Sequence, residues 1–214
     1  MAHHPSFTVL PTSLDADLIL ADTAADAEWA RTDLSTLTEQ EKNHAAEFEP
    51  DAGAIWVAGR VILRHVLGAH LDQDPAGIEI RLDSAGKPRI AECEFSVTRA
   101  RRLVLVAVSE DPVGVDLEAV PSHDVAAEAM ALLHPKEQSD LAEVDDSRLA
   151  EDFVRVWARK EAFLKALSTG LARDPGMDYI GAAVSPASPH PDVDIHDVES
   201  GIPEGYRAAI AFNR

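Results

Sequence analysis

The sequence predicts a fold that mixes α-helices with β-strands and divides into two halves with one common order of elements. In each half, residues 1–109 and 110–214, a strand pattern is followed by helical patterns and then by further strands. The spacing of apolar residues distinguishes the two kinds of element, because apolar residues alternate in strands and recur every three to four positions in helices. We therefore expect an N-terminal lobe at 1–109 and a C-terminal lobe at 110–214.

Composition narrows the class of protein. Of the 214 residues, 46% are hydrophobic, which is enough for a core. The net charge of -19 argues against nucleic acid or an anionic membrane as the main partner, since both require a concentrated positive surface. The single cysteine, Cys93, excludes an intrachain disulfide and fits a reducing cytoplasm. The sequence shows no signal peptide and no apolar run of membrane-spanning length, so we expect a cytoplasmic protein. We also expect a monomer.

Periodicity and turn residues place the elements of the first half. Thr38 and Glu41 have the spacing of a capping box, which predicts a helix that runs to about Phe48. Pro50 to Gly53 is read as a break before the next helix. The expected helices are at residues 22–33, 38–48 and 54–67. The expected strands are at residues 7–10, 17–21, 78–82, 95–98 and 103–109, of which the last is apolar on both faces and therefore central.

The second half opens with a strand that carries paired acids. Alternation along residues 113–120 places Gly114, Asp116 and Glu118 on one face. The two carboxylates repel one another. Mg²⁺ would explain the pair, since it takes oxygen ligands and usually binds one or two protein carboxylates together with substrate phosphate. The alternative is an ordinary solvated strand face in an acidic protein.

A helix predicted at residues 153–171 carries charges among its apolar positions. Phe153, Trp157 and Leu164 define the face to be buried, yet Lys160 and Glu161 fall within the same arc. Burial of an unpaired charge is costly, so a partner, metal or ligand is expected there. The alternative is a surface ion pair between Glu161 and Lys165, four residues apart. The remaining elements are helical segments over 121–150 and strands at 178–184, 193–198 and 205–212.

Three arginines lie between the strands at 95–98 and 103–109, namely Arg99, Arg101 and Arg102. They are either a solubilising turn or an anion site, because guanidinium groups match the geometry of phosphate oxygens. The sequence alone leaves both interpretations open.

Three motifs taken together resemble the 4′-phosphopantetheinyl transferases of the Sfp type. They are GKP at Gly86 to Pro88, GVDLE at Gly114 to Glu118 and WARKEAFLK at Trp157 to Lys165. The resemblance implies an α+β fold of two similar lobes related by a pseudo-two-fold axis, each with helices packed on a small, mostly antiparallel sheet. It also implies that coenzyme A lies in the cleft between the lobes, and that its phosphopantetheine is transferred to a serine of an acyl, peptidyl or aryl carrier protein with release of 3′,5′-ADP.

The resemblance further implies a role for each matching residue. Asp116, Glu118 and Glu161 would hold Mg²⁺, and Glu161 would also be the base for the carrier serine. Lys165 would stabilise the leaving phosphate, and Lys160 would contact phosphate from the same helix. The nucleotide end of coenzyme A would be bordered by Lys87, Pro88, Thr98 and Arg99.

Two departures from the family concern the nucleotide end. Arg99 stands where relatives carry a histidine, and residues 48–55 lack the basic side chains common in the family. A protein that binds carriers or nucleotides without turnover is therefore the alternative to an enzyme.

Overall fold

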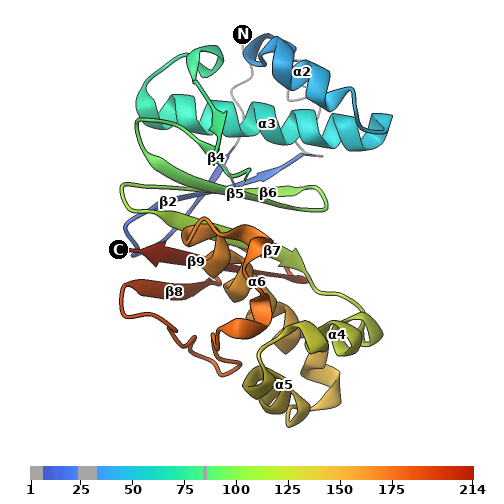
Figure 1. Cartoon of the computed structure of the whole chain (residues 1–214). Helices are drawn as coiled ribbons and strands as arrows, with labels where there is room; N and C mark the ends of the chain where they lie inside the picture. The colour runs from blue at the N-terminus through green and yellow to red at the C-terminus, as the bar shows by residue number, and fades with distance from the viewer. Residues whose placement is uncertain (1–6, 24–32, 84–85) are drawn as a thin grey trace.

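The computed structural model of the chain describes residues 7–23, 33–83 and 86–214, and it has four layers (Figure 1). Two antiparallel sheets lie face to face in the middle, with a long helix on the outer side of each. The predicted combination of helices with small antiparallel sheets in an α+β fold is confirmed.

The first sheet has the strand order β1-β2-β6-β5, and every neighbouring pair is antiparallel. Its strands are β1 (Thr8–Leu10), β2 (Asp17–Asp22), β5 (Glu94–Ala100) and β6 (Leu103–Ser109). All seven residues of β6 are buried, as expected for a central strand. A separate two-stranded ribbon pairs β3 (Arg81–Leu82) with β4 (Pro88–Arg89).

Two helices cover the first sheet. In α2 (Glu39–Ala45) the predicted capping box is present, with the Thr38 hydroxyl accepting from the Glu41 N–H and the Glu41 carboxylate accepting from the Thr38 N–H. The long helix α3 (Pro50–Leu71) packs its buried side chains, including Val61, Ile62 and Val66, on the outer face of this sheet.

The second sheet has the order β7-β9-β8, again antiparallel, with strands β7 (Val113–Ala119), β8 (Val193–Val198) and β9 (Tyr206–Asn213). It is covered by α6 (Leu149–Ala166), and α4 (His123–Ala129) and α5 (Pro135–Ala142) pack beside that helix. Short 3-10 turns connect these elements at residues 34–36, 75–77, 130–132, 146–148, 170–172 and 175–177.

The two sheets share one core. Leu105 and Leu20 from the first sheet contact a cluster that includes Val115, Leu117 and Ile210 from the second. The Oγ of Ser96 on β5 accepts a hydrogen bond from the Val115 N–H at 3.0 Å, which joins the edge of one sheet to the other. Strands β5 and β7 therefore form the junction between the halves.

Several predicted boundaries are wrong for identifiable reasons. Pro50 begins α3 instead of interrupting the chain, because proline at the first helical position removes an N–H that has no partner there anyway. Residues 178–184 form no strand, because three of their carbonyls accept hydrogen bonds from buried cations of α6: those of Gly181 and Ala183 from Arg159, and that of Asp178 from Lys160. The helix predicted at 153–171 ends at Ala166, and Ser168 has a positive φ of 57°. The helix predicted at 22–33 lies outside the described residues.

Helix α3 qualifies by length and composition as a possible membrane span, contrary to the reading of the sequence. Within its most apolar window 56% of the residues are buried inside the protein, which is the behaviour of a core helix.

Candidate functional site

The site is built where α6 crosses β7. A side chain at Gly114 would place its Cβ 2.0 Å from the Ala162 carbonyl oxygen and 2.4 Å from the Ala166 N–H nitrogen. Only glycine therefore allows the helix to lie directly on the strand. This close approach brings the charged side chains of α6 next to the two carboxylates that follow Gly114 on β7.

Asp116 is the buried centre of the site, with 3% of its surface exposed. Its Oδ1 accepts a hydrogen bond from the Thr98 hydroxyl at 2.9 Å and pairs with the Lys165 ammonium at 2.6 Å. Its Oδ2 is buried without a hydrogen-bond partner. A buried carboxylate oxygen of this kind needs a ligand, water or cation to offset its desolvation.

Glu118 and Glu161 are half-buried beside Asp116. Burial, followed by the charge of Asp116, raises the pKa of Glu118 to about 7. The same two causes, in the same order, raise the pKa of Glu161. Three carboxylates therefore share one region, and each additional negative charge makes the others harder to ionise.

This arrangement fits a hard divalent cation bound together with phosphate. Among the described residues no three His, Cys, Asp or Glu side chains already surround a single point as ligands. Mg²⁺ does not require such a cage, because it usually binds through one or two carboxylates and keeps several waters. The unpartnered Asp116 Oδ2 and the mutual repulsion of the carboxylates are the observations that favour a cation here.

Lys165 and Lys87 meet at the end of α6. Lys165 pairs with Asp116 across the helix–strand contact, so the simple surface pair with Glu161 is not what the structure shows. The Lys87 ammonium donates to the carbonyls of Val113 and Lys165, each at 2.9 Å. Burial lowers the pKa of Lys87 to about 8. Lys87 therefore ties the β3–β4 ribbon to the start of β7 and the end of α6.

Lys160 is not part of this group. Its ammonium pairs with Glu137 of α5 at 2.7 Å and donates to the Asp178 carbonyl at 2.6 Å, and both side chains are almost fully buried. Glu137 also accepts from the Ile180 N–H. The expectation that a buried Lys160 needs a partner is confirmed, but its geometry is that of a structural ion pair between α5 and α6. The predicted contact with phosphate has no support in this arrangement.

A cavity of about 210 Å³ opens next to Lys165. It is bounded by Lys87 and Pro88 of the ribbon side, by Val97 of β5 and by Ser168 after α6. Its lining combines apolar side chains with the two lysines Lys87 and Lys165. The cavity is a suitable size for part of a small-molecule ligand rather than for a whole nucleotide.

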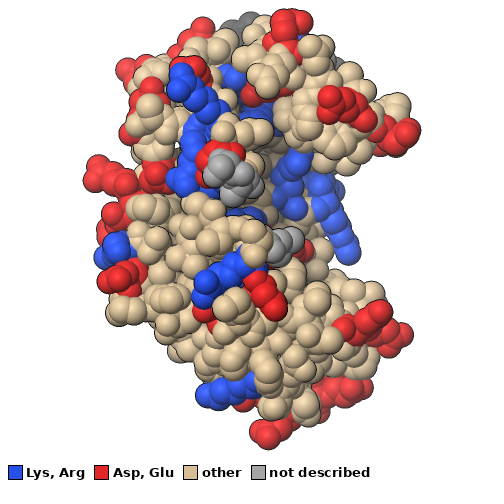
Figure 2. Space-filling view, viewed as in Figure 1, with Lys and Arg blue, Asp and Glu red and all other residues tan. Residues whose placement is uncertain are grey.

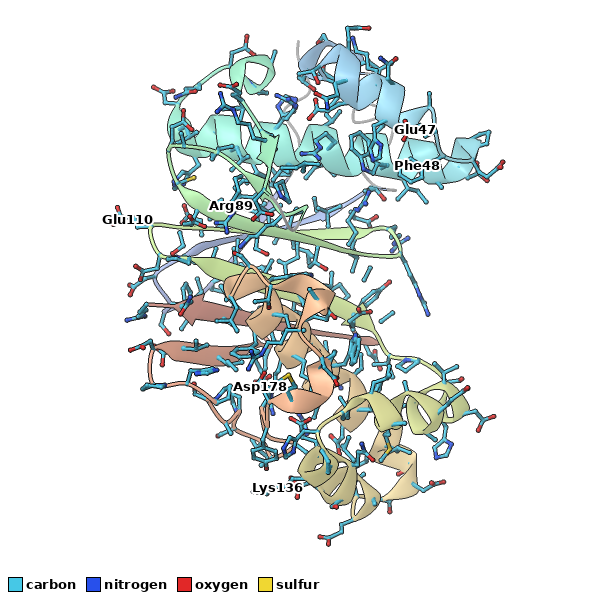
Figure 3. All side chains as sticks on the ribbon, viewed as in Figure 1. Glu47, Phe48, Arg89, Glu110, Lys136 and Asp178 are labelled. Carbon is cyan, nitrogen blue, oxygen red and sulfur yellow. The ribbon has the colours of Figure 1, made fainter. Side chains whose placement is uncertain are left out.

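Two of the residues predicted to border the nucleotide end of coenzyme A, Thr98 and Arg99, point in different directions. Thr98 is buried and directed at Asp116, so it acts on the carboxylate centre. Arg99 points the other way, against α3, where its Cδ would lie 2.9 Å from a Cβ at Gly59. Phe48, at the end of the loop that leads into α3, is 40% exposed (Figure 3). None of residues 48–55 is a lysine, arginine or histidine, so this stretch offers no cation to this region.

Charge is distributed unevenly over the surface. Figure 2 shows Lys and Arg side chains gathered around the hollowed waist between the two halves, with Asp and Glu mostly toward the periphery. In a protein of net charge -19 this local positive zone is a suitable place for an anion. Carboxylates and a lysine at one junction, with a positive zone beside them, fit a protein that binds a phosphate-containing ligand.

Comparison with known proteins defines that class further. The chain matches the 4′-phosphopantetheinyl transferase superfamily over residues 112–211. It is 33% identical to the 4′-phosphopantetheinyl transferase HetI of Nostoc sp. over 164 residues, which are 72% of this chain and 68% of HetI. It is 27% identical to the 4′-phosphopantetheinyl transferase Sfp of Bacillus subtilis over 117 residues, which are 53% of this chain and 52% of Sfp.

The chain therefore belongs to the 4′-phosphopantetheinyl transferase superfamily, a family of enzymes. The predicted resemblance to the Sfp type is confirmed. For Sfp, the match spans about half the length of the relative.

Sequence reasoning missed two features of this region. The first is the role of Gly114 in the GVDLE motif. Gly114 allows close contact between β7 and α6, and the pattern of a strand alone cannot show that a helix crosses it there. Trp56 and Arg60 of α3 also lie near Arg99, and nothing in their helical spacing separates them from ordinary surface residues.

Proposed function

We propose that the protein transfers the 4′-phosphopantetheine group of coenzyme A to a serine of an acyl, peptidyl or aryl carrier protein, with Mg²⁺ and with release of 3′,5′-ADP. The observation that carries the proposal is the convergence of Asp116, Glu118, Glu161 and Lys165 at the α6–β7 crossing of a chain in this family. We further propose that it acts as a monomer in the cytoplasm.

The reaction forms a bond between the serine oxygen and the phosphorus of the phosphopantetheine, while the bond from that phosphorus to the pyrophosphate bridging oxygen breaks. Asp116, Glu118 and Glu161 would hold Mg²⁺, which when bound neutralises charge on the pyrophosphate. Glu161 would also accept the serine proton as the general base. Lys165, which pairs with Asp116, would stabilise the leaving phosphate.

At the other end of the substrate, we propose that Arg99 binds the 3′-phosphate in the place of the family's histidine. Arg99 is exposed and lies on the wall of a cavity with Pro88. Its charge is fixed, so this contact would not weaken between pH 6 and pH 8, where an ordinary histidine with a pKa of about 6.5 loses its charge.

The second candidate is a relative that binds carriers or nucleotides without turnover. It is favoured by the absence of cations along residues 48–55 and by Lys165 being held by Asp116. The complete set of three acids favours the enzyme, because binding alone does not require a positioned base.

The deciding experiment is incubation with coenzyme A, Mg²⁺ and a panel of apo-carrier proteins, followed by intact mass measurement. A mass increase equal to phosphopantetheine on at least one carrier, abolished by chelator, supports the enzyme. Tight coenzyme A binding by calorimetry without any mass increase across acyl, peptidyl and aryl carriers would establish the non-catalytic candidate instead.

A further inference from the structure

The last turn of α6 ends in a backbone conformation that favours glycine, yet it carries a serine. Ser168 follows the C-cap residue Leu167 and has a positive φ of 57°. Its N–H donates to the carbonyl of Lys165, and the N–H of Thr169 donates back to the carbonyl of Leu164. These two bonds form a Schellman motif, in which glycine is the usual residue at the left-handed position. A serine is strained there, so a compensating contact of its side chain is expected.

The side chain of Ser168 makes such a contact. Its hydroxyl accepts a hydrogen bond from Nη2 of Arg89, which lies on β4 of the separate two-stranded ribbon. The other two nitrogens of this guanidinium are also used, since Nε pairs with Asp83 at 3.2 Å and Nη1 pairs with Glu94 at 2.6 Å. All three nitrogens of Arg89 are therefore engaged, and among these three partners Ser168 belongs to the second half of the chain.

The ribbon needs attachments of this kind because it is too small to hold itself in place. Its strands β3 and β4 have two residues each, and an isolated pair of strands is marginally stable in water. Lys87 supplies one attachment, through the carbonyls of Val113 and Lys165. Arg89 supplies a second, through Ser168. Both attachments reach the same turn of the chain, because the Lys165 carbonyl also accepts the Ser168 N–H.

The two attachments shape the cavity of about 210 Å³ beside Lys165. Its lining includes Lys87 and Pro88 from the ribbon, and Lys165 and Ser168 from the end of α6. Without the contact between Arg89 and Ser168, only the Lys87 attachment of these two would remain. The ribbon could then shift relative to α6, and the Lys87 ammonium would shift with it.

We propose that Arg89 and Ser168 form a latch that holds the β3–β4 ribbon on the end of α6 and thereby fixes Lys87 beside Lys165 in the lining of this cavity. Both are positioning residues, since each acts on a bound ligand through Lys87. The inference rests on the proposed function, with Lys87 bordering coenzyme A, so the latch determines how tightly coenzyme A is bound. The strain at Ser168 is retained because its hydroxyl, which glycine lacks, is the acceptor that the latch requires.

Two substitutions of Ser168 separate the role of the hydroxyl from that of the backbone. Ser168→Gly and Ser168→Ala both remove the acceptor, but only glycine also relieves the left-handed strain. In thermal melts Ser168→Gly should therefore unfold about 2–4 °C above Ser168→Ala. In calorimetry with Mg²⁺ present, coenzyme A should bind both variants about 3- to 10-fold more weakly than wild type, the loss expected for one hydrogen bond. An equal loss of affinity in two variants of different stability is not explained by stability.

Hydrogen exchange follows the ribbon directly, without any ligand. The Asp83 N–H donates to the Lys87 carbonyl, and the Lys87 N–H donates to the Asp83 carboxylate, each at 2.9 Å. Both amides should exchange faster in Ser168→Gly than in wild type. Arg89→Gln should weaken coenzyme A at least as much as Ser168→Gly does. Addition of Ser168→Gly to Arg89→Gln should cause no further loss, because the contact is already absent.

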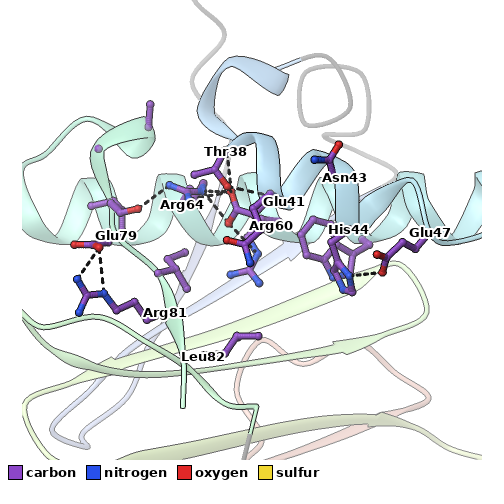
Figure 4. Close-up of a pocket in the computed structure, with 16 residues that line it drawn as sticks. Thr38, Glu41, Asn43, His44, Glu47, Arg60, Arg64, Glu79, Arg81 and Leu82 are labelled. Carbon is purple, nitrogen blue, oxygen red and sulfur yellow. Dashed lines mark hydrogen bonds and ion pairs between the residues drawn. The ribbon is translucent and has the colours of Figure 1, made fainter. Parts of the chain in front are cut away.

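Arg81→Gln is the matched control, because Arg81 lies on β3 of the same ribbon and pairs with Glu79 at 2.7 Å. Figure 4 shows this pair at a different cavity, between α2, α3 and the ribbon, whose lining does not include Ser168. The Arg81 side chain is 76% exposed, so the loss of its ion pair has little effect on the fold. The substitution removes the same charge as Arg89→Gln and should change coenzyme A affinity by no more than about twofold.

Unchanged exchange of the Asp83 and Lys87 amides in Ser168→Gly would overturn the latch. A normal coenzyme A affinity in Ser168→Gly would overturn the positioning role, because the hydroxyl would then serve stability only. A wild-type protein that neither binds coenzyme A nor modifies a carrier would reject the proposed function together with the effect on affinity. Faster exchange of the ribbon amides in the variants would still support the latch in that case, so the two failures are distinguishable.

Discussion

Replacement of Glu118 by glutamine should stabilise the protein in the absence of divalent cations. Burial and the charge of Asp116 raise the pKa of Glu118 from 4.5 to about 7. A carboxyl group whose pKa is higher in the folded than in the unfolded state lowers stability when it ionises. The penalty is absent below the unfolded pKa, grows between pH 4.5 and about 7, and is fully present above that range.

The size of the effect follows from the shift. A rise from 4.5 to about 7, at about 1.4 kcal/mol per unit, sets an upper limit of about 3.4 kcal/mol. Glu118 is only half-buried, so solvent screening reduces this limit to about 1–2 kcal/mol. Glutamine keeps the shape of the side chain and removes its charge, so it should recover that amount at pH 8 and only a small part of it at pH 5.

Urea unfolding at pH 5 and pH 8 with chelator present measures the difference directly. Glu204→Gln, at an exposed glutamate, is the control for the general effect of net charge. Added Mg²⁺ should stabilise wild type at pH 8 and stabilise Glu118→Gln less. A Glu118→Gln variant that is no more stable than wild type at pH 8, or equally more stable at both pH values, would refute the reasoning.

The other predictions concern neighbouring residues. Asp116→Ala leaves Thr98 and Lys165 without their acceptor, so transfer should stop and unfolding free energy in urea should fall by about 2–3 kcal/mol; unchanged activity in chelator would contradict this. Glu161→Gln should lower single-turnover transfer by about 100-fold or more while coenzyme A affinity by calorimetry changes little; a normal rate would assign the base elsewhere. Gly114→Ala forces α6 off β7 and should cost about 3 kcal/mol in the same urea assay, and a neutral result would mean that the helix shifts freely.

Most of the fold was accessible from local patterns. Strand alternation places β2, β5, β6 and β7 within a few residues of their actual limits, and the Thr38–Glu41 spacing predicts the start of α2. The errors arise where tertiary contacts override local preference. Residues 178–184 have the composition of a strand, but the carbonyls of Gly181 and Ala183 are needed by Arg159 of α6, so they stay in an irregular loop.

The site was predictable in part. Alternation on β7 and the charge pattern of α6 identify Asp116, Glu118 and Glu161 without any knowledge of how the two elements cross. Lys160 and Glu161 are adjacent in sequence and equally unusual on an apolar arc, yet Lys160 faces α5. A helix turns by about 100° per residue, so neighbours on it serve different partners, and periodicity cannot say which of two charges belongs to the site.

The core shared by the two sheets limits how far the two halves of the protein can move apart. Separating the halves would expose Leu105, Val115 and Ile210 to water at about 25 cal/mol per Å² of apolar surface. A hinge motion that separates the two sheets is therefore energetically unfavourable. Each half expressed alone would expose the sheet face that the other half covers. Under the proposed function, coenzyme A and a carrier protein would therefore bind at a junction whose buried interior keeps its shape.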